Sequence, residues 1–278
     1  MERFTVKIAT RYNNKWLFIK EEDKKFYRMP GGRVKHGKEI YSQVKNLLYE
    51  QLGVVEACLY RVNEVYFYAD VRCIGAVPLD NGIVDVAEVH ENNVYDVSAS
   101  SPMRVLSTAE RNSFIKIHDW LFRRRRHLFK EPCVQFEKVC GSVPFKEMDG
   151  VRYYLLVKNE SGHIGFPKGH VEEKETEEET AMREMFEETG LDIPLLDGFR
   201  YSFEYIIPKY KRRRRTIKLA VYFIAEFQDE TIKIQTSEIS RWWLVPYKEA
   251  LNILNKENDR ELLRHANAWL DKTKKLSK

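Results

Sequence analysis

The sequence lacks the features that mark several special classes of protein. Its 278 residues include only four cysteines, no CxxC pair and no cluster of cysteine and histidine with zinc-ligand spacing, which argues against a disulfide framework and against a zinc finger. No apolar run reaches the roughly 20 residues that a membrane-spanning helix needs, and no amino-terminal signal peptide is recognisable. We therefore expect reduced thiols, no membrane association and a cytoplasmic location.

Proline and glycine are also scarce, with 9 and 13 residues, which leaves little room for long disordered linkers. The 43% of hydrophobic residues are enough for a core of ordinary size in each of two domains. The net charge of +5 is mildly basic, which suits an anionic substrate or partner without requiring one. The positive charge is concentrated in two runs, at 123–126 and 211–215. Whether these runs contact substrate, RNA or only solvent remains open.

The sequence contains two copies of one pattern. The segment MPGGRV at 29–34 matches FPKGHV at 166–171. In each copy another glycine follows 21 positions after the last glycine of this segment: Gly53 follows Gly32, and Gly190 follows Gly169. Further on, IHDWL at 117–121 resembles ANAWL at 266–270, with a larger offset. We therefore predict two tandem domains, 1–130 and 131–278, joined near 123–132, with an insertion around 208–215 in the second.

Each half mixes predicted strands and helices in a similar order. Alternating hydrophobic residues predict strands at 5–10, 16–20, 153–158 and 219–227. Asn13-Asn14 and Asp149-Gly150 are typical of tight hairpin turns, and a last helix is predicted at about 247–272. This mixture predicts an α/β or, more narrowly, α+β fold, in which a mixed sheet lies between helices.

The most informative segment is a predicted helix at 177–189. Thr176 is a suitable N-cap, and Glu179 three positions later completes a capping box. Gly190 follows the helix, where glycine readily adopts the left-handed conformation that ends many helices. Ala181 and Met185 lie on a face that can pack on a sheet.

Three further glutamates of this helix are not explained by capping. Glu184, Glu187 and Glu188 lie within an arc of roughly 100° on one face. Like charges at this spacing destabilise a helix slightly, so either water solvates them or they bind a cation. Mg²⁺ prefers oxygen ligands and keeps several waters, so a few carboxylates and substrate phosphates suffice to bind it.

The spacing around this helix resembles the signature of the Nudix hydrolase family. Gly169 is followed after five residues by Glu175 and, after seven more, by REMFEETGL at 183–191. All nine specified positions of the family pattern are occupied over 23 residues, and the similarity extends over 134–270. The resemblance predicts two tandem Nudix-type α/β/α sandwiches, of which the second is an active hydrolase of nucleoside diphosphates linked to another group.

The resemblance also implies which residues carry the chemistry. In this family a loop–helix–loop motif binds a divalent metal, Mg²⁺ with Mn²⁺ as a substitute, on the diphosphate, and water attacks phosphorus. It implies Glu187 and Glu188 as metal ligands with the Gly169 carbonyl nearby. Glu184 is then a further ligand or the group that acts on the attacking water.

Two more roles follow from the same resemblance. Arg183 and Glu175 would form an ion pair that orients the motif. Family members differ in the position of the general base, and Glu238 lies in a region that often supplies a further acidic group. An exposed loop carboxylate with no catalytic role is the alternative for Glu238.

Two other segments resemble the dinucleoside tetraphosphate hydrolase branch of the family, GFPKGHVE at 165–172 and GFRYSFEY at 198–205. The resemblance implies that Tyr205 stacks on an adenine and that Lys218 contacts phosphates. Lys168 and His170 are also suited to a polyphosphate chain. Lys174 departs from the branch, which usually has glycine before the signature glutamate.

The first copy has lost most of the signature. It keeps a glutamate, Glu50, at the position of Glu187. The other signature positions differ, with Lys38 for Glu175, Asn46 for Arg183, Leu47 for Glu184 and Gln51 for Glu188. A single carboxylate binds Mg²⁺ on a diphosphate poorly. We therefore predict a catalytically inactive Nudix-like domain, for which dimerisation, substrate binding and regulation all remain open.

Three other functions stay as alternatives to hydrolysis of a dinucleoside polyphosphate such as diadenosine tetraphosphate. Diphosphoinositol polyphosphates carry a denser charge that suits a basic arm, and the 5′-triphosphate end of RNA suits the two basic runs. A non-catalytic RNA-binding or regulatory protein is the third. A small-molecule polyphosphate substrate needs neither nucleic acid nor membrane, and a homodimer through the first domain stays open.

Overall fold

The computed structural model describes residues 3–35, 40–76, 82–96, 98–128, 134–207 and 215–276, without the side chains of 122–128 and 275–276. The side chains of the arginine run at 123–126, and all of the second basic run except Arg215, lie outside the described residues, as does Lys38. Among the helices of the described segments, none is long and apolar enough to cross a membrane.

The chain forms two compact units. The amino-terminal unit comprises Met1–Glu137, Glu172–Lys174 and Ile206–Lys218, and the carboxyl-terminal unit comprises Lys138–Val171, Glu175–Tyr205 and Leu219–Lys278. The first unit extends beyond the predicted join near 130 because the start of strand β7 pairs with strand β4, with Gln135 opposite Cys58.

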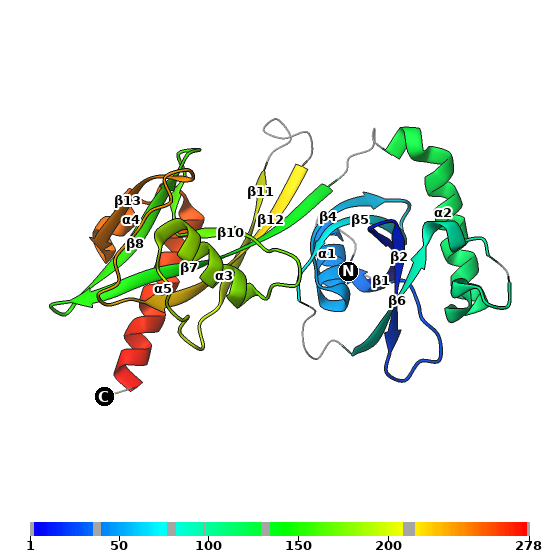
Figure 1. The fold of residues 1–278 in the computed structure, drawn as a ribbon, viewed down its shortest axis with the longest axis horizontal. Coiled ribbons are helices and arrows are strands. Elements are labelled where there is room, and N and C mark those ends of the chain that lie inside the picture. Colours follow the sequence, from blue (N-terminus) through cyan, green and yellow to red (C-terminus); the bar gives the residue numbers. More distant parts are fainter. Residues whose placement is uncertain are drawn as a thin grey trace. The chain divides into compact units, whose positions relative to one another are not determined.

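The amino-terminal unit is built on a mixed sheet in the order β4-β5-β1-β2-β6, with β3 also paired to β1 (Figure 1). Strand β1 runs parallel to β5 and antiparallel to β2 and β3. The elements are β1 Arg3–Tyr12, β2 Lys15–Glu21, β3 Gly31–Lys35, α1 Ile40–Leu52, β4 Val54–Arg61, β5 Tyr66–Ile74, β6 Ile83–His90 and α2 Thr108–Leu128, with 3₁₀ turns at Glu91–Asn93 and Pro102–Val105.

The carboxyl-terminal unit has the sheet order β11-β12-β7-β8-β13, with β10 also paired to β7 and β9 to β8. Its elements are β7 Val134–Met148, β8 Val151–Asn159, β9 Ile164–Gly165, β10 Lys168–His170, α3 Glu177–Thr189, β11 Tyr201–Ile207, β12 Arg215–Glu226, β13 Ile239–Pro246, α4 Tyr247–Ile253 and α5 Glu257–Leu276.

The two units share one topology. Strands β7, β8, β10, β11, β12 and β13 occupy the places of β1, β2, β3, β4, β5 and β6 in the strand order, and the single helix after β10 corresponds to the one after β3. Helices α1 and α3 each have 13 residues. Each is followed by a left-handed glycine, Gly53 with φ of 67° and Gly190 with φ of 72°.

Helices cover both faces of the sheet in each unit. In the carboxyl-terminal unit Met185 of α3 packs with Leu155, whereas Leu262 of α5 packs with Leu156 on the next position of β8. Because successive residues of a strand point to opposite faces, α3 and α5 lie on opposite sides of the sheet. The same holds for α1 and α2, whose apolar residues belong to separate core clusters. The mixed sheet between helices confirms the predicted fold class.

Most predicted elements are confirmed, and one is wrong. Three of the predicted strands are parts of β1, β2 and β8, and the fourth, 219–227, matches β12 except for its last residue. Both hairpin turns have the expected positive φ, for example 48° at Asn13 and 51° at Asp149. The predicted helix at 247–272 is instead two helices, because Leu254 leaves the helical conformation with ψ of 125°. Asn255 then accepts a hydrogen bond from the backbone of Ile164 and donates one to Gly162.

Candidate active site

Helix α3 is ordered by the signals that predicted it. The Thr176 hydroxyl accepts from the backbone N–H of Glu179, and the Glu179 carboxylate accepts from the Thr176 N–H, so the predicted capping box is present. Ala181 and Met185 are fully buried against the sheet. The opposite side of the helix therefore presents its glutamates to strand β10 and to the turn before β13.

Strand β10 approaches this helix more closely than most residue types would permit. A Cβ added to Gly169 would overlap the carboxyl group of Glu184, and one added to Gly141 of β7 would overlap the Pro167 carbonyl. Glycine at both places lets the β10 backbone lie directly against the carboxylates of α3. The backbone of Gly169 thereby lies beside the Glu184 carboxyl group.

Arg183 is the centre of the hydrogen-bond network in the site. Its Nε and Nη2 atoms donate to the two Glu175 carboxylate oxygens at 2.6 and 3.0 Å, and Nη1 donates to Glu184 and Glu187 at 2.8 and 3.0 Å. Nη2 also donates to the His170 carbonyl at 2.9 Å. The hydrogen bond to Glu175 is the main cause that raises the Arg183 pKa. This guanidinium ties α3 to the loop before it and to β10.

Glu175 has a second partner that the sequence did not indicate. The buried Thr180 hydroxyl lies 2.8 Å from the Glu175 carboxylate and 2.9 Å from the Thr176 carbonyl. Thr180 stands at an unspecified position of the family pattern, so no sequence signal marked it. Together with Arg183 it holds the Glu175 side chain in one place.

Glu184 and Glu188 are buried carboxylates, each less than a tenth exposed. Burial raises the pKa of Glu188 to about 8, against the opposing charge of Lys168 and a hydrogen bond from the Lys168 backbone. Burial also raises the pKa of Glu184, against the hydrogen bond from Arg183. The charges of Glu184 and Glu238 add to the rise at Glu188. Ionisation of these carboxyl groups is therefore unfavourable, and a bound cation would offset that cost.

Glu238 lies in the turn before β13, and that turn is attached to the end of α3. The backbone N–H groups of Lys233 and Gln235 donate to the Thr189 and Glu188 carbonyls at 2.8 and 3.2 Å. Glu238 is exposed, and its charge acts on both Glu184 and Glu188. The structure thus brings Glu238 to the predicted carboxylate cluster.

The side chains do not form a closed metal cage. No group of three or more His, Cys, Asp or Glu side chains in the described segments converges tightly enough to hold an ion by itself. Glu187 is 46% exposed, and it shares the Arg183 Nη1 atom with Glu184. A few carboxylates beside open solvent are the arrangement that suits Mg²⁺, which keeps water and takes substrate oxygens as ligands.

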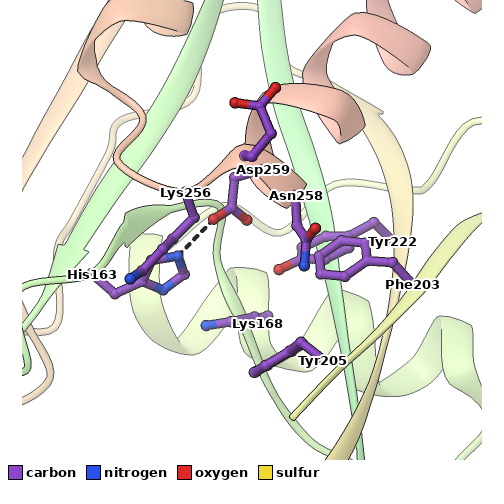
Figure 2. Close-up of a pocket in the computed structure, with 9 residues that line it drawn as sticks. His163, Lys168, Phe203, Tyr205, Tyr222, Lys256, Asn258 and Asp259 are labelled. Atoms are coloured by element: carbon purple, nitrogen blue, oxygen red, sulfur yellow. Dashed lines mark hydrogen bonds and ion pairs between the residues drawn. The ribbon is translucent and has the colours of Figure 1, made fainter. Parts of the chain in front are cut away.

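A pocket of about 350 Å³ adjoins this cluster at Lys168 (Figure 2). Its lining combines three aromatic rings with charged and polar groups: Phe203, Tyr205, Tyr222, Lys168, His163, Lys256, Glu257, Asn258 and Asp259. Phe203 stacks on Tyr222, with ring centroids 5.9 Å apart. The Lys168 backbone donates to Glu188 while its side chain lines the pocket. Lys168 therefore connects the carboxylates to the pocket.

The remaining predicted substrate residues differ in their placement. Tyr205 lines the pocket, as its expected stacking role requires. His170 is exposed, and its backbone carbonyl is the group that contacts Arg183. Lys218 is buried and forms an ion pair with Glu137 at 3.0 Å, and neither residue lines the pocket. Sequence reasoning missed His163 and Asp259, because the segments that carry them contain no recognisable motif.

Comparison with known proteins shows the family of the chain. The family model described as NUDIX domain matches residues 142–266. The asymmetrical bis(5′-nucleosyl)-tetraphosphatase of Mus musculus is 32% identical over 112 residues, which cover 36% of this chain and 72% of the relative. The chain belongs to the Nudix family. It is accordingly a Nudix pyrophosphohydrolase, an enzyme that hydrolyses pyrophosphate bonds.

Other relatives also match this Nudix chain. The asymmetrical bis(5′-nucleosyl)-tetraphosphatase of Sus scrofa is 29% identical over 119 residues, covering 38% of this chain and 77% of the relative. Among solved structures, a Caenorhabditis elegans Ap4A hydrolase binary complex has 24% identity and a TM-score of 0.44, covering 48% of this chain and 97% of that one.

Proposed function

We propose that the carboxyl-terminal unit hydrolyses a phosphoanhydride bond of a dinucleoside polyphosphate, such as diadenosine tetraphosphate, in a Mg²⁺-dependent reaction. The observation that carries the proposal is the position of Lys168. Its backbone donates to Glu188, and its side chain lines an aromatic pocket. A ligand whose phosphates meet the carboxylate cluster through a metal ion therefore has a place for its nucleoside next to them.

The residues present fit a divalent cation. Glu184 and Glu188 are both buried, and burial disfavours their ionised forms. The charge of Glu184 adds to this effect at Glu188, and the charges of Glu187 and Glu238 add to it at Glu184. Glu187 adds a carboxylate that is open to solvent, and the backbone of Gly169 lies beside the Glu184 carboxyl group. When bound, Mg²⁺ polarises the phosphoryl oxygens and lowers the pKa of a coordinated water. We assign Glu184, Glu187, Glu188 and the Gly169 carbonyl as the groups that would hold it.

The other groups of the site act on the substrate and on the geometry. Arg183 fixes the side chains of Glu175, Glu184 and Glu187 relative to one another, so that the ligand oxygens need little rearrangement. Glu238 is the exposed carboxylate at the cluster, and we assign it as a proton acceptor for the attacking water.

The pocket suits a nucleoside. Its volume of about 350 Å³ lies in the range of small-molecule sites, and Tyr205 offers an aromatic face on which a purine can stack. Lys168 supplies a cation for the phosphate nearest to the base. The names of the relatives from mouse and pig, which act on dinucleoside tetraphosphates, support the same substrate class.

We also propose that the amino-terminal unit is a degenerate, inactive copy of the same domain. The strand order that this unit shares with the carboxyl-terminal unit supports its assignment as a copy. Leu47 occupies the place of Glu184 and lies against Gly32, where an added Cβ would be 2.9 Å from its side chain. Gln51, in place of Glu188, accepts from the Gly31 N–H at 2.9 Å and donates to the Gly31 carbonyl at 3.0 Å. An apolar side chain and an amide bound to the backbone replace the carboxylates.

The test is a Mg²⁺-dependent turnover panel with the full chain. Its substrates are diadenosine tetraphosphate, ADP-ribose, nucleoside triphosphates, diphosphoinositol phosphates and triphosphorylated RNA. We expect the highest kcat/KM for diadenosine tetraphosphate, with activity lost in chelator and restored by Mg²⁺ or Mn²⁺. A higher kcat/KM for any other member would overturn the substrate assignment.

A matched pair of variants tests the assignment of the two copies. Glu188→Gln removes a proposed metal ligand, and we expect turnover to fall by about two orders of magnitude or more, or ~3 kcal/mol. Glu50→Gln removes the one signature carboxylate that the amino-terminal copy retains, at the position of Glu187, and should leave turnover within about twofold of the parent. Nearly full activity of the first variant would refute the metal site, and a large loss in the second would show that copy one is active.

A further inference from the structure

We propose that Asp259 is a positioning residue that holds the imidazole of His163 in one orientation and one tautomer, so that Nδ1 of His163 accepts a hydrogen bond from a donor group of the bound nucleoside. The proposal rests on the proposed function, because it names how the pocket beside Lys168 recognises its ligand. It assigns a role to two residues that the sequence did not single out.

The contact between the two side chains is direct. His163 Nε2 lies 2.7 Å from Asp259 Oδ2, and Figure 2 shows this hydrogen bond at the wall of the pocket. The Asp259 side chain is only 4% exposed, whereas the His163 side chain is 22% exposed. A buried carboxylate needs a hydrogen-bond donor to offset its desolvation. The imidazole N–H of His163 provides that donor, so the pair fixes both partners.

Steric contacts fix the ring from its other side. A Cβ added to Gly165 would lie 3.0 Å from Cε1 and 3.1 Å from Nε2 of His163, so the ring packs closely against the Gly165 backbone. Asn159 Oδ1 accepts from the His163 backbone N–H at 3.0 Å. Asn255, just before α5, bonds to the neighbouring residues of this turn. The imidazole therefore has little freedom to rotate away from Asp259.

This arrangement selects a tautomer. Because Asp259 accepts a hydrogen from Nε2, the neutral ring carries its proton there and leaves a lone pair on Nδ1. No residue within the described part of the chain forms a hydrogen bond with Nδ1, and His163 lines the pocket. The lone pair is therefore available to a ligand. Such an acceptor pairs with a hydroxyl or amino group, which a ribose or a purine offers.

The charged groups around His163 complement this role. Lys168 comes from β10, Glu257 is the first residue of α5, and Lys256 directly precedes that helix. The Glu257 carboxylate is paired with Arg260 at 3.1 Å. The two lysines suit phosphate oxygens, while the neutral acceptor on His163 suits an uncharged donor. The pocket thus separates recognition of the nucleoside from recognition of the phosphates.

The first test needs no turnover. Long-range ¹H–¹⁵N NMR of the ¹⁵N-histidine-labelled full chain near neutral pH should show His163 as the neutral Nε2–H tautomer, assigned by its loss in His163→Ala. Asp259→Ala should convert this signal to a mixture of tautomers. Asp271 lies on the same helix as Asp259 and forms an ion pair with Arg152 of β8. The control change Asp271→Asn removes that ion pair and should leave the His163 signal unaltered. An Nδ1–H tautomer in the parent protein would overturn the proposal.

The second test uses kinetics with diadenosine tetraphosphate. We expect His163→Ala and Asp259→Ala each to raise KM about fivefold, the effect of one neutral hydrogen bond, with kcat changed less than twofold. Asp259→Asn, which keeps an acceptor oxygen, should restore most of the affinity. The double variant should be no worse than His163→Ala alone, because Asp259 acts only through the ring. Additive losses in the double variant would contradict this dependence.

Substrate analogues identify the donor and separate this proposal from the proposed function. Analogues that lack the exocyclic amine, the 2′-hydroxyl or the 3′-hydroxyl should each be turned over by the parent. For one of them, His163→Ala should no longer raise KM. If His163→Ala raised KM equally for all three analogues, the hydrogen bond to Nδ1 would be refuted. Failure of the parent to hydrolyse any dinucleoside polyphosphate would instead refute the proposed function.

Discussion

The carboxyl group of Glu184 lies against the α-carbon of Gly169, in the space that a side chain at position 169 would need. The amino-terminal unit repeats this relationship with Leu47 against Gly32. The close approach of strand and helix is thus common to both units. The units differ in the helix side chain at this contact, which is a carboxylate in one and an apolar group in the other. The amino-terminal unit thus keeps the close backbone contact with an apolar side chain in place of the carboxylate.

This contact predicts that Gly169→Ala will reduce turnover strongly without unfolding the protein. The new methyl group must displace the Glu184 carboxylate, and a misplacement of about 1 Å can lower a rate by roughly a hundredfold. The measurement is kcat with diadenosine tetraphosphate at saturating Mg²⁺. Gly32→Ala is the matched control, since it meets only the flexible end of Leu47; a similar loss in both variants would indicate a general folding defect.

The guanidinium of Arg183 predicts a second result. It donates five hydrogen bonds from three nitrogen atoms, to three carboxylates and one carbonyl, and a lysine ammonium cannot reproduce this geometry. We expect Arg183→Lys to lower kcat about 10- to 100-fold, the usual effect of losing a group that orients metal ligands. Retention of kcat would show that charge alone is sufficient. Circular dichroism should show unchanged helix content.

The features of helix α3 that sequence reasoning predicted correctly are those with local signals. The capping residues Thr176 and Glu179, the final Gly190 and the spacing of the glutamates act within one helix, so their pattern along the chain determined the prediction. The sheet with helices on both faces also followed from alternating strands and periodic helices. These features depend on neighbours in the sequence, which a single chain displays directly.

The parts that were missed depend on residues far apart in the chain. His163 and Asp259 are separated by 96 positions and meet only after α5 packs on the sheet. No proline or glycine marks the break in the helix at Leu254. The break is instead accompanied by hydrogen bonds between Asn255 and a loop that is distant in the sequence. The partner of Lys218, Glu137, is equally remote. Only tertiary packing creates these contacts.

The position of Tyr205 in the pocket predicts a change in substrate affinity. Stacking of a base on an aromatic ring contributes roughly 1–3 kcal/mol, so Tyr205→Ala should raise KM for diadenosine tetraphosphate about tenfold. Tyr205→Phe keeps the ring and should leave KM within about twofold. The comparison substrate is inorganic tripolyphosphate, which has no base. An equal rise in KM for both substrates would exclude stacking as the cause.

Lys174 predicts a gain in stability. It adopts a φ of 65°, where a side chain is unfavourable by about 1–2 kcal/mol, and its backbone N–H donates to the Ile74 carbonyl. Lys174→Gly keeps that hydrogen bond and removes the strain, at the cost of greater freedom in the unfolded chain. We expect a net gain of about 0.5–1 kcal/mol in urea unfolding. Lys233→Gly, at a position without a positive φ, should not stabilise the protein.

The ion pairs of Glu177 predict a stability that depends on pH. Burial alone would raise the pKa of Glu177, but hydrogen bonds from Arg200 at 2.6 and 2.8 Å and the charge of Lys138 outweigh it and lower the pKa to about 2. A carboxylate with a folded pKa below its unfolded value of about 4.5 stabilises the native state fully above pH 4.5, and this contribution is lost as the pH falls toward 2.

Glu177→Gln should therefore lower the free energy of unfolding at pH 7 by roughly 3 kcal/mol, the equivalent of the pKa shift. Below pH 4.5 the difference between parent and variant should shrink, and near pH 2 it should vanish. Glu178→Gln is the matched control in the same helical turn, since Glu178 is exposed, and it should change stability by no more than about 0.5 kcal/mol. A deficit in Glu177→Gln that stays constant from pH 7 to pH 3 would mean that packing, and not the ionised pair with Lys138 and Arg200, supplies the stability.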